Sequence, residues 1–309
     1  NKQKTLLLEQ FFFRPLQRER SWPDQLIRKT YEEDFFIQMM QESYELWAQL
    51  EREAGAHRPV DYGPRERRGF LTPKGHDAKA QVPTVFLEKQ ELSHHIPNVT
   101  LTDGNGALID THAGVLYADR RVFQSSGGVI KDGEKVIDIT PGVAWGSLVI
   151  TAGPWANTLL THTGLQLPLK VVKINVCYWK EKIPGTYSVS QWEYDIYGLL
   201  SNEYPGLIKE SNRRDTKPDE RDKQTDRGNI DILVRYVTGC LPGLVPVPAV
   251  MKSCMYMVTP DHNFVLDSHP IYGNIIISAG FSGHGFKFDP IIGKLLSQLA
   301  MGQAPSKDL

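Results

Sequence analysis

The sequence predicts an α/β protein with two parts, one built from buried strands that lead into helices and one built from a mainly antiparallel sheet. Residues 147–160 and 274–299 predict the first part, because each places a short apolar run before a glycine turn and a helical pattern. Residues 169–179 predict the second part, since β-branched and polar residues alternate along them. A chain of 309 residues is long enough for one large or two ordinary domains.

The composition gives no support to several classes of partner. The chain is 40% hydrophobic and its net charge is −1, so nothing favours nucleic acid or an acidic membrane surface. No apolar run approaches the length of a membrane span. The three cysteines, Cys177, Cys240 and Cys254, are too few and too scattered for a disulfide framework. We expect His262 and His269 to lie at the surface or in turns, and we expect no metal site.

The first predicted strand, residues 5–10, is an apolar run that we expect to be buried and that carries Glu9 near its end. In a dinucleotide-binding fold, a carboxylate at the end of the second strand binds a ribose, and a glycine-rich turn stands about twenty residues before it. No G-x-G-x-x-G motif occurs in this chain. We therefore expect the first strand and the phosphate-binding turn of such a fold to be absent.

The elements that follow are predicted from periodicity and from turn residues. Residues 35–54 carry apolar side chains at helical spacing and predict a helix. Residues 57–81 are charged, contain Gly and Pro, and predict a loop. Residues 127–139 predict two short strands around a turn. The short interval 118–126 leaves no room for a crossover helix before them, so we expect internal segments to be missing.

The antiparallel part is expected to extend beyond its first long strand. Residues 195–198 and 204–209 predict strands that continue this sheet. Residues 211–229 are dense in Lys, Arg and Asp and predict a solvated loop.

The stretch from Cys254 to Lys287 is the most informative part of the chain. Gly280, Gly283 and Gly285 follow an Ile-rich strand and let the backbone turn sharply and approach a ligand closely. A helix that begins just after such a loop presents unpaired N–H groups, which suit an anionic or electron-rich ligand. A flat cofactor would suit this place.

The amino-acid sequence of this stretch is similar to that of a known family. Cys254-Met-Tyr-x-x-Thr-Pro-Asp261, followed by Ala279-Gly-Phe-Ser-Gly-His-Gly-Phe-Lys287, resembles the monomeric sarcosine oxidase family and most closely its peroxisomal sarcosine (L-pipecolate) oxidase branch. The resemblance implies the D-amino-acid-oxidase type of fold. It implies a Rossmann-like FAD-binding domain assembled from discontinuous segments and an α+β substrate domain with a mainly antiparallel sheet. The expected bounds are 1–56, 101–168 and 259–309 for the FAD-binding domain, and 57–100 and 169–258 for the substrate domain.

The same resemblance implies an activity. Members of the family oxidise a secondary amino acid, such as sarcosine or L-pipecolate, by hydride transfer to FAD, and O2 becomes H2O2. We expect a monomer in the peroxisome whose partners are an amino acid and O2, although the end Ser306-Lys-Asp-Leu309 is not a peroxisomal S-K-L signal. The sequence does not distinguish sarcosine, pipecolate and proline as substrates.

The resemblance also implies roles for individual residues. Lys287 and Arg28 would lie near the substrate carboxylate, Tyr256 and Tyr197 would line the pocket, and Lys209 would assist oxygen activation. For both tyrosines, core packing is the alternative interpretation.

The remaining expected site residues would contact the cofactor. Cys254 would carry FAD through a thioether, where a buried structural cysteine is the alternative. The other residues expected to bind the cofactor are Glu9, Val136, Ala152, Gly153, Trp155, Gly283, His284 and Gly285.

The chain departs from the family pattern at several catalytic positions. Where the family has a histidine, this chain has Ser21 or a neighbour, and where the family has an inner arginine, it has Gln25. The histidine that the family carries soon after the position of Lys209 is also missing. A second hypothesis is therefore a non-catalytic remnant that cannot bind FAD. A third, a hydrolase with Cys254 as nucleophile, has no evident base or G-x-S-x-G element in the sequence.

Overall fold

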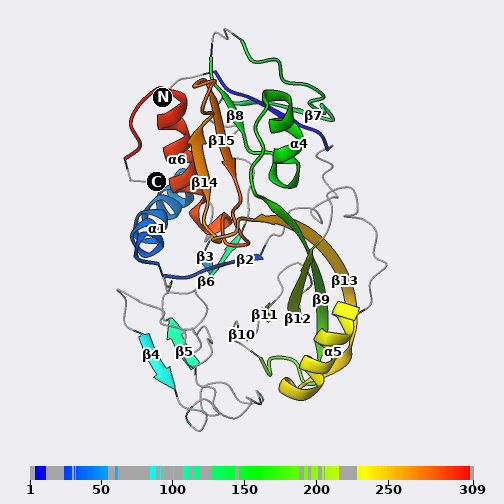
Figure 1. The fold of residues 1–309 in the computed structure, drawn as a ribbon. Helices are drawn as coiled ribbons and strands as arrows, with labels where there is room; N and C mark the ends of the chain where they lie inside the picture. Colours follow the sequence, from blue (N-terminus) through cyan, green and yellow to red (C-terminus); the bar gives the residue numbers. More distant parts are fainter. Residues whose placement is uncertain are drawn as a thin grey trace.

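The protein is described here from a computed structural model. The described residues are 4–11, 24–29, 31, 33–54, 60–61, 84–87, 91, 100, 107–110, 114–117, 127–142, 146–187, 191–193, 196–200, 204, 206–215 and 228–306. Within these ranges the chain has the predicted mixture of helices and sheets (Figure 1).

In β15 (Ile275–Ala279), all five residues are buried. It lies between β14 (Val265–Ser268), to which it is antiparallel, and β8 (Leu148–Ile150), to which it is parallel. Figure 1 shows α6 (Asp289–Ala300) on one side of this sheet and α4 (Ala156–Leu160) on the other. An Ile-rich strand covered on both faces agrees with the prediction for residues 274–299.

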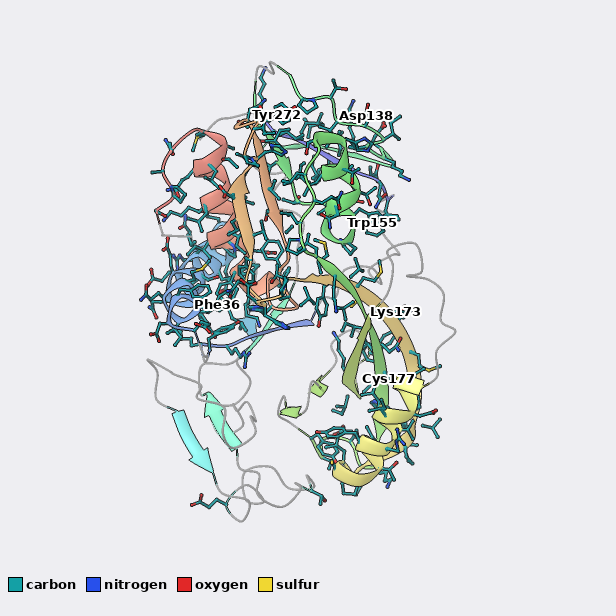
Figure 2. All side chains as sticks on the ribbon, in the orientation of Figure 1. Phe36, Asp138, Trp155, Lys173, Cys177 and Tyr272 are labelled. Carbon is teal, nitrogen blue, oxygen red and sulfur yellow. The ribbon has the colours of Figure 1, made fainter. Side chains whose placement is uncertain are left out.

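The helix predicted at residues 35–54 is present as α1 (Asp34–Ala54). It packs against α6, and the Lys294 ammonium of α6 lies 2.5 Å from the Glu42 carboxylate of α1. Together with Ile276 of β15, the two helices form one apolar cluster that contains Phe36 and Met40 (Figure 2).

The second part is the predicted antiparallel sheet, now with five strands. Their order is β10 (Gln191–Glu193), β11 (Ile196–Leu200), β12 (Leu207–Asp215), β9 (Lys170–Glu181) and β13 (Leu244–Val258). The helix α5 (Gly228–Cys240) covers one face, where it packs on the buried side chains of Cys177 and Trp179 (Figure 2). The loop predicted at 211–229 is wrong at both ends, because β12 continues to Asp215 and α5 begins at Gly228.

Two further small sheets are formed by strands β2 to β6. β2 (Asp24–Ile27) and β3 (Val60–Asp61) flank β6 (Gly114–Tyr117), and β4 (Thr84–Leu87) pairs with β5 (Ala107–Asp110). β3 replaces part of the loop predicted at 57–81, of which residues 57–59 and 62–81 lie outside the described ranges. The predicted domain bounds stay a prediction.

The strand near Glu9 is present, but its predicted burial is wrong. β1 (Leu6–Glu9) pairs in parallel with β7 (Val129–Asp132), and Leu6, Leu7 and Leu8 are 53%, 37% and 45% exposed. Apolar residues predict a strand, but burial also requires a covering layer, and the described chain supplies none here. Residues 133–139 form no second strand after β7.

A buried histidine fastens the turn between β14 and β15 to the segment after α4. His269 is 3% exposed, and its Nδ1 accepts hydrogen bonds from the backbone of Ile271 and Tyr272 at 3.1 and 3.2 Å. Its Nε2 must therefore carry the proton, which it donates to Thr163 Oγ1 at 3.0 Å. The prediction of a surface or turn position for His269 holds through the turn, where the side chain is buried.

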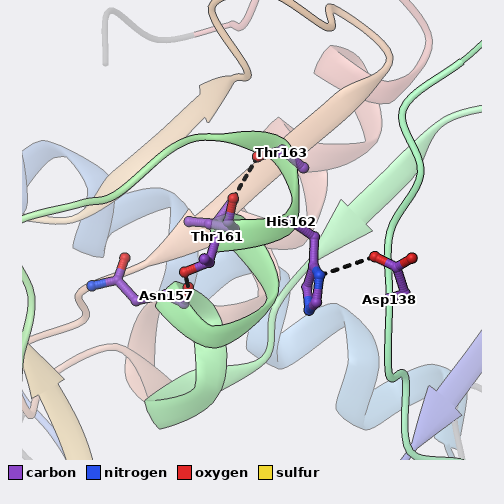
Figure 3. A network of polar contacts seen from close by, with 6 residues as sticks. Asp138, Asn157, Thr161, His162 and Thr163 are labelled. Atoms are coloured by element: carbon purple, nitrogen blue, oxygen red, sulfur yellow. Dashed lines mark hydrogen bonds and ion pairs between the residues drawn. The ribbon is translucent and has the colours of Figure 1, made fainter.

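The same segment makes a second polar contact at the surface. Figure 3 shows His162 beside Asp138, with 2.9 Å between Nδ1 and Oδ1, so that the chain after β7 is tied to the 3-10 turn η3 (Thr161–Thr163). In the described part of the chain, no helix is both long and apolar enough to cross a bilayer.

The buried contact of His269 generates a stability prediction. We expect Thr163→Val to lower the free energy of unfolding by about 1–3 kcal/mol, because the mutation leaves a buried N–H without an acceptor. Thr158→Val, an exposed position in α4, is the matched control and should change it by less than about 0.5 kcal/mol. Urea unfolding of both variants gives the comparison, and equal effects would contradict this role for Thr163.

Candidate functional site

The site forms where the glycine loop, residues 280–285, packs against the end of β13. Ser282 N donates to the Met257 carbonyl at 2.8 Å, and Thr259 N donates to Ser282 Oγ at 3.3 Å. Ser282 has φ 50°, a left-handed conformation that non-glycine residues seldom adopt. These bonds hold the loop in a bent form directly over the last residues of the strand.

Two glycines make this close packing possible. Gly283 has φ +84°, and a Cβ atom there would lie 3.1 Å from Tyr256 Cζ. A Cβ atom at Gly285 would lie 2.6 Å from the Cβ of Phe281. Any side chain at either position would push the loop away from the strand or from itself, so both glycines are required by the geometry.

Lys209, Cys254 and Tyr256 lie on the face of the antiparallel sheet that is opposite α5. Lys209 pairs with Tyr178, Cys254 with Ile174 and Tyr256 with Val172, and paired residues of antiparallel strands share a face. Tyr178, Ile174 and Val172 belong to the apolar cluster on this face, which also includes Cys254 and Tyr256. Lys209 is 1% exposed.

The electrostatics of this face hold the cysteine in its neutral form. Burial raises the pKa of the Cys254 thiol to about 12, and the nearby Lys209 ammonium opposes that rise only in part. A protonated thiol needs a base before it acts as a nucleophile, and the sequence offers no evident base partner for a hydrolase.

Lys287 and Arg28 form a second, strongly positive group beside the glycine loop. Lys287 lies in the 3-10 turn η5 (Phe286–Phe288) and is 8% exposed. Burial, and after it the charge of Arg28, hold the pKa of the Lys287 ammonium well below its usual range. The ring of Tyr31 lies against both cations, 4.9 Å from Arg28 Cζ and 5.7 Å from Lys287 Nζ.

The main chain of Lys287 is fixed by α1. Ser43 Oγ and Trp47 Nε1, one turn apart on the helix, donate to the same Lys287 carbonyl at 2.5 and 3.0 Å. The sequence predicts a helix over residues 35–54, and its pattern does not single out Ser43, Trp47 or Tyr31 as site residues. The available signal was a serine at position 43 amid the apolar spacing of Met39, Met40 and Trp47.

The imidazole of His284 points into an aromatic cluster. Its ring centroid is 4.8 Å from Phe36 and 4.9 Å from Phe264, and its Nε2 donates to the His262 carbonyl at 3.1 Å. Burial lowers the pKa of His284 to about 3, and the charges of Lys287 and Arg28 act in the same direction. Within the described atoms, its buried Nδ1 has no hydrogen-bond donor.

The residues expected on the nucleotide side lie at the ends of β1 and β8. Glu9 Oε1 accepts from Phe11 N at 3.0 Å, and the Phe11 ring meets the Trp155 ring edge-on at 5.5 Å. Trp155 and Gly153 belong to the 3-10 turn η2 (Gly153–Trp155), which follows Ala152. Gly153 has φ +51°, and no atom lies within 4 Å of a Cβ built there.

Two of the predicted site residues, Val136 and Tyr197, lie in other segments. Val136 is half-buried in the irregular chain after β7. Tyr197 occupies a register position in β11 opposite Ser211 of β12, and its side chain lies outside the described atoms. In the described ranges, no group of three or more His, Cys, Asp or Glu side chains is arranged to hold a metal ion.

Comparisons with known proteins test the family resemblance. The family described as FAD dependent oxidoreductase (DAO) matches residues 12–299. The peroxisomal sarcosine oxidase of Homo sapiens is 43% identical over 346 aligned positions, covering 100% of this chain and 89% of the human protein. The monomeric sarcosine oxidase of Arthrobacter sp. (strain TE1826) is 27% identical over 99% of this chain and 88% of its own. The human alignment is longer than this chain, so it contains positions that this chain lacks.

Solved structures agree on the fold. NikD, an amino acid oxidase essential for nikkomycin biosynthesis, has a TM-score of 0.82 at 18% identity, covering 99% of this chain and 89% of its own. Glycine oxidase from Geobacillus kaustophilus has a TM-score of 0.80 at 16% identity, covering 99% of this chain and 90% of its own. The chain therefore belongs to the FAD dependent oxidoreductase family and is a homologue of its sarcosine oxidases.

Proposed function

We propose that this protein oxidises a secondary amino acid, with sarcosine and L-pipecolate as the first candidates. A hydride leaves the carbon next to nitrogen, a proton leaves the nitrogen, and an imine forms. O2 takes up the two electrons with two protons and becomes H2O2. The observation that carries this proposal is the buried Lys287 next to the half-buried Arg28 beside the glycine loop, since two cations suit the carboxylate of an amino acid.

The residues present fit FAD in three places. The loop at Gly283 exposes backbone beside the Tyr256 ring, Gly153 has open space where a side chain would stand, and Glu9 carries a carboxylate near the end of β1. FAD, when bound, supplies the acceptor for the hydride, while this chain supplies placement and charge.

Three further residues would act around the reacting atoms. Tyr256, packed on Gly283, would exclude water and orient the substrate, and Tyr197 is proposed for the same pocket. The Lys209 ammonium would stabilise the negative charge that develops on oxygen as it is reduced.

The cellular setting is proposed from relatives. The human and mouse relatives are both named peroxisomal sarcosine oxidase, at 43% and 42% identity, which supports residence in the peroxisome. The bacterial relatives named monomeric sarcosine oxidase support a monomer.

A second candidate is the remnant that does not bind FAD. It is favoured by the exposed leucines of β1 and by the separation of β1 and β7 from the sheet of β15 within the described residues. Nucleotide binding would need these strand ends to be held together. In the described residues, the contact between Phe11 and Trp155 and the pair of Asp138 with His162 are side-chain bridges between the two parts.

Flavin absorbance distinguishes these two candidates and tests Cys254. We expect the purified protein to be yellow, and we expect the absorbance to stay with the acid-precipitated protein because of a thioether at Cys254. Cys254→Ala should bind flavin that acid releases, and Cys177→Ala, a buried cysteine facing α5, is the control that should keep the covalent link. A colourless wild-type protein would favour the remnant, and release of all flavin from it would contradict the thioether.

The role of Lys209 predicts a selective loss of reaction with oxygen. Lys209→Met should slow the reoxidation of the anaerobically reduced enzyme by about 100-fold or more, the effect typical of removing one electrostatic stabiliser. Anaerobic reduction by sarcosine should stay within about threefold. Lys180→Met, an exposed lysine on β9, is the control. Equal slowing of both half-reactions in stopped-flow measurements would contradict the role.

The lowered pKa of Lys287 predicts the pH dependence of carboxylate binding. The groups that face Lys287 are Arg28, His284 and Tyr31. Only protonated Lys287 attracts an anion, so the affinity for acetate should fall as pH rises above the lowered pKa, by up to about tenfold per pH unit.

Calorimetric titration of the flavin-loaded protein with acetate between pH 6 and pH 10 measures this dependence. Lys287→Met should bind acetate more weakly and with little pH dependence. Lys294→Met, which removes the lysine paired with Glu42, should keep the wild-type profile. An unchanged profile in Lys287→Met would assign the titration to another group.

A further inference from the structure

Tyr31 has an unusual place between two cations. It is 6% exposed, and its ring centroid is 4.9 Å from the guanidinium carbon of Arg28 and 5.7 Å from the Lys287 ammonium. Both distances lie within the range in which an aromatic ring attracts a cation. One ring therefore contacts both positive groups that we propose for the substrate carboxylate.

An aromatic ring can reduce the repulsion between Arg28 and Lys287 without neutralising them, which a carboxylate side chain cannot do. The half-buried Arg28 and the buried Lys287 repel each other when both are charged, as the effect of Arg28 on the pKa of Lys287 indicates. A neighbouring Asp or Glu would relieve this repulsion, but it would also neutralise the cations and repel an incoming carboxylate. The electron-rich face of Tyr31 attracts the cations and leaves their charge available to the ligand.

The surroundings of Tyr31 hold the ring in place. It packs against Phe36 and Phe288, with ring centroids 5.4 and 5.5 Å away. Lys287 is held independently by the bonds from Ser43 and Trp47 to its carbonyl. The positions of ring and lysine backbone are therefore fixed by separate contacts, and the ammonium is drawn to the ring across the short distance between them.

We propose that Tyr31 is a positioning residue that holds Arg28 and Lys287 together as a clamp for the carboxylate of the substrate. The inference rests on the proposed function for the identity of the ligand. The phenol hydroxyl has no part in it, since the ring face makes both contacts.

The test varies the ring and measures acetate binding to the flavin-loaded protein. Tyr31→Phe keeps a ring and should bind acetate within about threefold of wild type. Tyr31→Leu removes it and should bind about 2- to 30-fold more weakly, the range expected for loss of cation–π contacts. The pH at which acetate binding is lost should also move down in Tyr31→Leu, because the ring no longer favours the charged lysine.

Two comparisons keep a packing effect apart from a charge effect. Phe264→Leu makes the same ring-to-aliphatic change in the same aromatic cluster, at a ring that contacts His284 and Phe288. It should leave the acetate affinity and its pH profile unchanged even if the melting temperature falls. Ring-fluorinated phenylalanines placed at position 31 keep the shape and withdraw electrons, so affinity should fall stepwise with each added fluorine.

The outcomes separate this inference from the proposed reaction. Fluorinated variants that all bind acetate equally, or Phe264→Leu that shifts the pH profile as Tyr31→Leu does, would overturn the role of Tyr31. Wild-type protein that does not bind acetate would also overturn it. Protein that binds acetate with the expected ring dependence but does not oxidise sarcosine or L-pipecolate would contradict the reaction alone.

Discussion

The site depends on one steric constraint, the packing of the glycine loop against the end of β13. At Gly283 the backbone comes so close to the Tyr256 ring that a Cβ atom would lie 3.1 Å from it. This contact joins the antiparallel sheet, which carries Lys209 and Cys254, to the segment that carries His284 and Lys287. Because the loop is also bonded to Met257 and Thr259, the two groups of side chains share a single frame. The side chains proposed to bind the substrate and those proposed to act on oxygen are therefore held by one set of backbone contacts.

The frame collects positive charge in a poorly solvated place. Lys209 and Lys287 are 1% and 8% exposed, and burial of a cation opposes folding unless something nearby favours the charge. The unfavourable free energy of burying these lysines is offset by apolar packing elsewhere, most clearly around β15 and α6. A negatively charged ligand would relieve the burden, so binding and stability should be coupled through these lysines.

Periodicity was sufficient for the elements whose burial is set by their own sequence, such as β15, α6, α1 and β9. Periodicity failed where the burial of an element depends on its neighbours in the fold. The leucines of β1 predict a buried strand, but no described layer covers them. The whole of helix α5 was missed, although Ile230, Leu233 and Val237 follow helical spacing after the charged stretch. The family motif located the glycine loop and Lys287. Ser43 and Tyr31 each contact Lys287 across more than 240 positions, which local pattern cannot reveal.

The two bonds from α1 to the Lys287 carbonyl affect how natural variation in this protein should be interpreted. Ser43 is fully buried in a helix that looks structural from its sequence, and a change there would ordinarily be classed as a folding defect. Its hydroxyl instead donates a hydrogen bond to the main-chain carbonyl of Lys287, a residue of the candidate site. A carrier of such a variant could have normal protein abundance and a raised Michaelis constant, so immunoblotting alone would miss the defect and an assay across substrate concentrations would detect it.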